Sequence, residues 1–226
     1  MAGKEPKPEH DQVLRSDARR NGEKIRQAAI EVFREHGIDA PMEAVVRRAG
    51  ISTATLYNHF RNRRNLIDSV APSLVSLGVE TVTRRAMRSP DPWERFVRLV
   101  MGLCEYQAAD PKFSDVIARR FVETGRIDQL CEKARGGAEA IITEAQSAGV
   151  LRDDITGEDI VLFVLGINSM IVRACAQVAP DAWRRYIGVV IDGLRADGID
   201  KLGADPIDAE LTFTLIRRLS APRSVV

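Results

Sequence analysis

Helical periodicity extends along almost the whole chain, and no other feature of the sequence restricts the fold as strongly. Residues 25–33, for example, place apolar side chains at the i, i+3, i+4, i+7 and i+8 positions that form one face of a helix. Strand signals, such as period-two alternation or an Asn-Gly hairpin, are nearly absent. The sequence therefore predicts an all-α protein, with helices over about 19–36, 41–49, 53–60, from 63 onward, 91–109, 113–121, 128–148, 156–178 and 180–194, and an amphipathic stretch at 208–219.

Glycine and proline divide these helices. Gly37, Gly50 and Gly149 follow the last apolar position of a helix, where a residue without Cβ adopts the left-handed conformation at little cost. Pro72 is expected to kink or interrupt the fourth helix, and Asp110-Pro111 to interrupt the one that follows, because proline removes a backbone hydrogen bond.

The charge is distributed unevenly, although the formal net charge is only +1. Residues 1–64 carry 13 Lys and Arg against 9 Asp and Glu, a net of +4, whereas residues 65–226 carry 20 against 23, a net of −3. A basic N-terminal part on a mildly acidic body indicates an anionic partner at one end of the chain, unless the asymmetry arose by chance. The contents of 45% hydrophobic and 29% charged residues are typical of a soluble globular protein.

The sequence indicates a cytoplasmic protein without a membrane partner. Its first residues contain no apolar segment of a signal peptide, and the longest weakly polar run, between Asp159 and Arg173, is too short to span a bilayer. Cysteines at positions 104, 131 and 175 are odd in number and show no paired spacing, as expected of reduced thiols.

No catalytic or metal-binding pattern stands out in the sequence. The histidines, His10, His36 and His59, form no cluster with cysteines or carboxylates at ligand spacing, and there is no glycine-rich phosphate loop. We therefore expect no metal, no cofactor and no enzymatic activity. The alternative is an all-α enzyme or ligand carrier with purely structural N-terminal helices, which would need a nucleophile–base pair or a metal cluster.

Residues 49–60 have the pattern of a helix-turn-helix. The first helix of the pair ends at Gly50, which supplies the turn without a Cβ penalty, and Ser52 or Thr53 caps the short helix that follows. Apolar side chains at Ile51, Leu56 and Phe60 would hold that helix against its neighbours, whereas small or polar groups face outward at Thr53, Ala54, Thr55, Tyr57, Asn58 and His59. Such groups suit a major groove and its phosphates, although three short helices around a glycine also occur in proteins that bind no DNA.

This segment and its flanking residues resemble the DNA-binding domain of the TetR family over about residues 19–70. The flanking residues that match are Ile25, Ala28, Ala29, Phe33 and Gly37 before the segment, and Arg63 and Leu66 after it. The resemblance implies that Thr53, Ala54 and Asn58 approach the bases, and that Thr55, Tyr57, His59 and Arg63 contact phosphates.

The sequence departs from the family pattern at three places. Pro41 stands where a threonine is common, Arg63 where lysine is usual, and Arg64 and Asn65 replace an acidic residue and its neighbour. Arg15, Arg19 and Arg20 either form an arm that reaches the minor groove or are a solvated helix start.

Two later helices, over about 157–178 and 180–195, are apolar on more than one face. A helix that is apolar all round is buried on more than one side, so we expect a homodimer formed through a four-helix bundle, as the resemblance also implies. The predicted interface residues are Phe163, Ile167, Met170, Ile187, Val190 and Leu194. The alternative is that both helices fill the core of a single protomer.

The middle helices, over about 63–149, are expected to form an effector pocket. Its predicted lining is apolar or sulfur-containing, which suits a hydrophobic or aromatic ligand, and consists of Trp93, Phe96, Met101, Cys104, Phe121, Phe163 and Met170. The same side chains at helical spacing would equally form an ordinary core.

The sequence thus predicts a flexible arm over residues 1–16, a helix-turn-helix domain over 17–64, and a helical effector-binding and dimerisation domain over 65–226. The resemblance implies a homodimer that binds palindromic double-stranded operator DNA and is released by a small hydrophobic effector. The sequence does not distinguish repression from activation, or from the loss of a ligand response.

Overall fold

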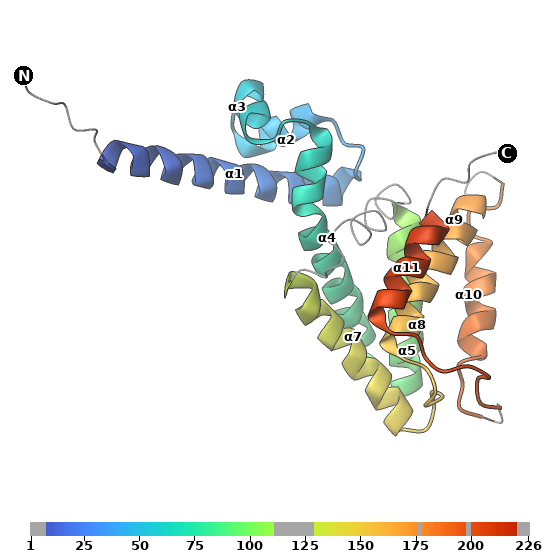
Figure 1. The fold of residues 1–226 in the computed structure, drawn as a ribbon. Coiled ribbons are helices and arrows are strands. Elements are labelled where there is room, and N and C mark those ends of the chain that lie inside the picture. The colour runs from blue at the N-terminus through green and yellow to red at the C-terminus, as the bar shows by residue number, and fades with distance from the viewer. Residues whose placement is uncertain (1–7, 111–128, 176–177, 198–199, 221–226) are drawn as a thin grey trace, which may run out of the picture. The chain divides into compact units, whose positions relative to one another are not determined.

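The computed structural model describes residues 8–110, 129–175, 178–197 and 200–220, and these residues are largely helical (Figure 1). The helices are α1 (Pro8–His36), α2 (Met42–Ala49), α3 (Thr53–His59), α4 (Arg63–Ala86), α5 (Pro92–Ala109), α7 (Gln129–Ser147), α8 (Gly157–Val161), the π-helical segment η1 (Leu162–Asn168), α9 (Ser169–Cys175), α10 (Trp183–Asp192) and α11 (Ala209–Ser220). In this part of the chain the only β-type pairing is an isolated bridge between Leu151 and Arg195. The predicted all-α fold is confirmed, and the predicted helix at 113–121 lies outside the described residues.

The chain divides into two compact units, Met1–Val70 and Ala71–Val226, so that α4 contributes to both. The division falls a few residues beyond the boundary predicted at 64/65.

In the first unit, α1, α2 and α3 pack around a small apolar core that includes Ile25, Val45 and Leu56, each with no exposed surface. Helix α1 begins at Pro8, well before the predicted start near Arg19, so residues 8–16 of the predicted arm are helical. Glu9, Gln12, Leu14 and Arg15 are good helix formers, and proline is well tolerated in the first turn, which is compatible with the longer helix.

Helix α4 is uninterrupted from Arg63 to Ala86, although it includes Pro72. The expected break is absent because proline removes only one intrahelical hydrogen bond, and a helix this long retains the others. By length and composition alone α4 could cross a membrane, with a mean hydropathy of 1.2 over an 18-residue window. That window is 44% buried inside the protein, and a single helix of this kind is weak evidence for a membrane span.

The second unit has its core between α5, α7, the stretch from α8 to α9, and α10. The largest fully buried side chains of this core include Phe96, Leu99, Ile141, Trp183 and Ile187. Thr156 begins the stretch from α8 to α9 with a capping box to Asp159, and the helix continues through η1 to Cys175. Figure 1 shows α11 lying along this stretch, which it contacts at α8 and η1.

Candidate DNA interface and effector region

The geometry of α3 is set by its two ends. Gly50, with φ 61°, makes the left-handed turn after α2, and the amide of Thr55 donates to the Ser52 hydroxyl at 3.1 Å, which caps α3. Leu56 then fixes α3 to the core, because its side chain is completely buried. The predicted turn and cap are therefore confirmed, with Ser52 rather than Thr53 as the capping residue.

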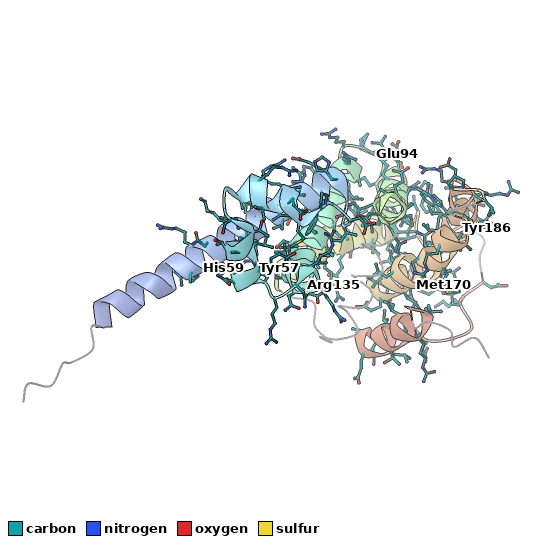
Figure 2. All side chains as sticks on the ribbon, turned by 90° about the horizontal axis from the view of Figure 1, so that it is seen from above. Tyr57, His59, Glu94, Arg135, Met170 and Tyr186 are labelled. Carbon is teal, nitrogen blue, oxygen red and sulfur yellow. The ribbon has the colours of Figure 1, made fainter. Side chains whose placement is uncertain are left out.

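The outer face of α3 carries the side chains expected to approach bases. Thr53, Ala54 and Asn58 are exposed, and so is Tyr57, with 47% of its surface accessible. Figure 2 shows Tyr57 and His59 on this helix. The face is small and uncharged at its centre, so it suits contact with base edges more than simple attraction to phosphate.

Two of the predicted phosphate contacts make hydrogen bonds within the protein, and a third is partly covered. The Thr55 hydroxyl lies 2.8 Å from that of Ser52, and His59 is half-buried near Gly22 of α1. The guanidinium of Arg63 donates to the backbone carbonyl of Ile38 and lies 5.9 Å from the centre of the Phe33 ring. Arg63 thus ties the start of α4 to the end of α1 and the loop after it.

Arg48 of α2 is likewise committed to the fold of the first unit. It pairs with Glu31 at 3.0 Å and with Glu35 at 2.6 Å, both on α1. Hydrogen bonds from Arg48 are the main cause that lowers the pKa of both carboxyls. Its neighbour Arg47 is also exposed, and Arg48 is held by the two carboxylates.

The residues predicted to line an effector pocket mostly meet in one place. Phe96, Cys104 and Phe163 belong to the buried core of the second unit, and Trp93 and Met101 pack against it. Burial raises the pKa of the Cys104 thiol to about 12, so it remains a neutral, apolar group. Met170 is instead exposed, with 38% of its surface accessible, and Phe121 lies outside the described residues.

The residues predicted for the dimer interface separate into two groups. Ile187 has no exposed surface and Phe163 is 9% exposed, so both belong to the protomer's own core rather than to a surface that a second copy would reach. These two assignments need correction, because each side chain lies on the inward face of a helix that is apolar all round. Ile167 is 46% exposed and, like Met170, faces outward, whereas Val190 and Leu194 are half-buried.

The sequence patterns missed two pairs of residues. Tyr186 and Val189 of α10 are large exposed side chains, at 54% and 67%. Gln107 and Asn168 form a buried hydrogen-bonded pair between α5 and η1. Gln107 and Asn168 could have been noticed in the sequence, because each is a single amide on an otherwise apolar helix face.

Over the described ranges, no group of three or more His, Cys, Asp or Glu side chains is placed to hold a metal ion.

Comparison with known proteins agrees with both units. Residues 25–70 match the family described as bacterial regulatory proteins, tetR family, and residues 91–196 match the C-terminal domain of SbtR-like transcriptional regulators. The chain therefore belongs to the TetR family of DNA-binding transcriptional regulators.

Individual relatives are distant. The chain is 36% identical over 72 residues to YvdT of Bacillus subtilis, an uncharacterized HTH-type transcriptional regulator, and this match covers 31% of the chain and 37% of that relative. The match therefore spans little more than a third of the length of this curated relative.

Two solved structures show the same fold. The TetR transcriptional regulator SCO0520 from Streptomyces coelicolor has a TM-score of 0.51 and 24% identity, over 78% of this chain and 99% of its own. The regulator FadR from Bacillus subtilis, solved with stearoyl-CoA, has a TM-score of 0.52 and 16% identity, over 78% and 98% of the two chains.

Proposed function

We propose that the protein is a homodimeric repressor that binds a palindromic operator through α3 and leaves it when a small hydrophobic effector binds the second unit. The observation that carries the proposal is the outer face of α3, where Thr53, Ala54 and Asn58 are exposed on a helix capped and anchored from behind. Tyr57 at the same face supplies a phosphate contact. Arg63 acts as a positioning residue, because its guanidinium is engaged by Ile38 and Phe33.

Dimerisation is supported by apolar side chains that a single protomer leaves exposed. Ile167 and Met170, on η1 and α9, and Tyr186 and Val189, on α10, are all more than a third exposed. Figure 2 labels Met170 and Tyr186 on their helices. These four residues, called here the dimer face, replace the core residues Phe163 and Ile187 in the proposed interface. A dimer presents two copies of α3 to successive major grooves, about 34 Å apart.

Release by an effector requires that the ligand bind one conformation of the second unit more tightly than another. The core that contains Phe96, Cys104 and Phe163 is apolar and uncharged, which supports a hydrophobic ligand. In the related fold of FadR, the solved protein contains stearoyl-CoA, a ligand with a long apolar chain.

The proposal is tested by selecting bound duplexes from a random pool and placing the selected site in a promoter. We expect inverted half-sites one helical turn apart, binding that weakens steeply with salt, and transcription that the protein lowers and a hydrophobic compound restores. Higher transcription on adding the protein would assign activation instead. Selection that returns no common sequence would contradict the proposal.

A further inference from the structure

Two buried helix faces meet in the second unit, and each carries one amide among apolar residues. The buried face of α5 includes Phe96, Val100, Cys104 and Gln107, and that of the stretch from α8 to α9 includes Ile160, Val164, Asn168 and Val172. Asn168 Nδ2 donates to Gln107 Oε1 at 2.6 Å, and the two residues are 0% and 5% exposed. The amides therefore pair where an ordinary core would place leucine.

The pairing leaves one polar atom of Asn168 unsatisfied. Within the described part of the chain, Asn168 Oδ1 is buried and accepts no hydrogen bond. A buried acceptor without a donor destabilises a fold, whereas two apolar residues of the same shape at these positions would cost little. Such an atom in a native protein calls for a specific explanation, and a donor that arrives with a ligand is one.

The surroundings of the pair select an uncharged ligand. The buried polar side chains of the described residues are all serine, threonine, asparagine or glutamine, without an acid or a base among them. Cys104, one turn before Gln107, is held neutral by burial. An anion or cation placed here would lose its hydration without a compensating charge.

The position of Asn168 also links this spot to the dimer face. Asn168 is the last residue of η1, and π-helical turns are rare and frequently occur at functional sites. Its neighbours Ile167 and Met170 point outward from the same short stretch. A ligand that bonds to Asn168 therefore acts on the segment whose opposite side carries half of the proposed dimer face.

We propose that Asn168 is the polar anchor of the effector site, and that the effector is an uncharged, largely apolar molecule with a hydroxyl or N–H group that donates to Asn168 Oδ1. This inference rests on the proposed release by an effector and adds the chemical class of that effector.

The test compares three series of probes on the full-length protein: linear primary alkanols, the matched methyl ethers and the matched alkanoates. Binding is measured by calorimetry, and release is measured on the selected operator. We expect alkanols to bind about tenfold more tightly than ethers, the order of one buried hydrogen bond, and alkanoates to bind most weakly.

A variant in which both amides are removed, Gln107→Leu with Asn168→Leu, should bind alkanols and ethers equally, with ether affinity retained. Changing both residues avoids leaving a single amide buried alone. The matched control is Ser169→Ala, which removes the adjacent buried hydroxyl that donates to Gly166, and it should keep the preference for alkanols.

The outcomes separate this inference from the proposed function. Three results would overturn the role of Asn168 as the anchor: equal binding of alkanols and ethers by the parent protein, tighter binding of alkanoates, or a preference for alkanols that persists in the double variant. Release of the operator by any probe would still uphold the proposed function. If no probe bound the protein or released the operator, both proposals would fail. The preference of the parent protein decides the matter even if the double variant does not fold.

Discussion

Replacing Gly78 by alanine tests how closely α4 and α5 pack. The Tyr106 hydroxyl of α5 donates to the carbonyl of Leu74 at 3.0 Å, which holds its ring against α4. A Cβ built on Gly78 would lie 2.5 Å from Tyr106 Cε1 and 2.8 Å from its hydroxyl oxygen. These distances are too short for real contacts, and an aromatic ring fixed at its hydroxyl cannot move aside without losing that hydrogen bond.

Two effects oppose each other in Gly78→Ala. Alanine favours the helix over glycine by about 0.5–1 kcal/mol, whereas overpacking a filled contact costs about 1–3 kcal/mol. We therefore expect a net loss of roughly 1–2 kcal/mol in the free energy of unfolding. In a Tyr106→Ala background the clash is gone, so the same change should instead stabilise the protein by about 0.5–1 kcal/mol.

The assay is urea unfolding followed by circular dichroism, with all variants at one protein concentration so that association between copies contributes equally to every measurement. Gly136→Ala in α7 is the matched control, since a Cβ there meets nothing within 4 Å. It should show only the gain from helix propensity. Equal effects of Gly78→Ala in the parent and in the Tyr106→Ala background would refute the packing argument.

Three further predictions concern the cap, the dimer face and an ion pair. Ser52→Ala should remove the cap of α3, lower the free energy of unfolding by about 1 kcal/mol and weaken operator binding. Denaturant unfolding measures the first effect and a gel shift the second, and unchanged binding would mean that α3 forms without its cap. Met170→Asp or Val189→Asp should yield monomers in sedimentation, whereas a dimer that persists in both variants would exclude this face. Hydrogen bonds from Arg152 hold the pKa of Asp154 well below its usual range, so the stability that this carboxylate contributes is present above its unfolded pKa and is lost as the pH falls through the folded value. The parent should melt at a higher temperature than Asp154→Asn near neutral pH, and this difference should shrink progressively as the pH falls below about 4. A difference that does not change with pH would contradict the assignment.

The boundaries of the helix-turn-helix could be predicted because the residues that set them act locally. Gly50 adopts the left-handed turn, and the Ser52 and Asn62 side chains accept hydrogen bonds from amides three residues later, all within one or two turns of the chain. The fully buried side chains of Ile25 and Leu56 also follow from periodicity, since one face of each helix is apolar.

The features that could not be predicted depend on residues distant in the sequence. The family pattern indicates a phosphate contact for Arg63, but it does not indicate the hydrogen bond from its guanidinium to Ile38, 25 residues away. The sequence predicts Ile187 at the dimer interface, whereas its side chain is fully buried in the protomer, because a helix that is apolar all round does not indicate which side faces its own core. The amide pair between Gln107 and Asn168 joins residues 61 positions apart, and no local pattern predicts that pairing.

The central claim is that α3 reads operator bases, and the most direct test is a scan of single base-pair changes in the selected operator with the parent protein and with Asn58→Ala. Asn58 is exposed on α3 and distant from the cap at Ser52, so its removal should leave the helix intact. The parent should discriminate at each half-site position by about 1–3 kcal/mol. Asn58→Ala should lose that discrimination at the same position of both half-sites and keep it elsewhere. An unchanged pattern of base preference in Asn58→Ala, with affinity also unchanged, would contradict the claim.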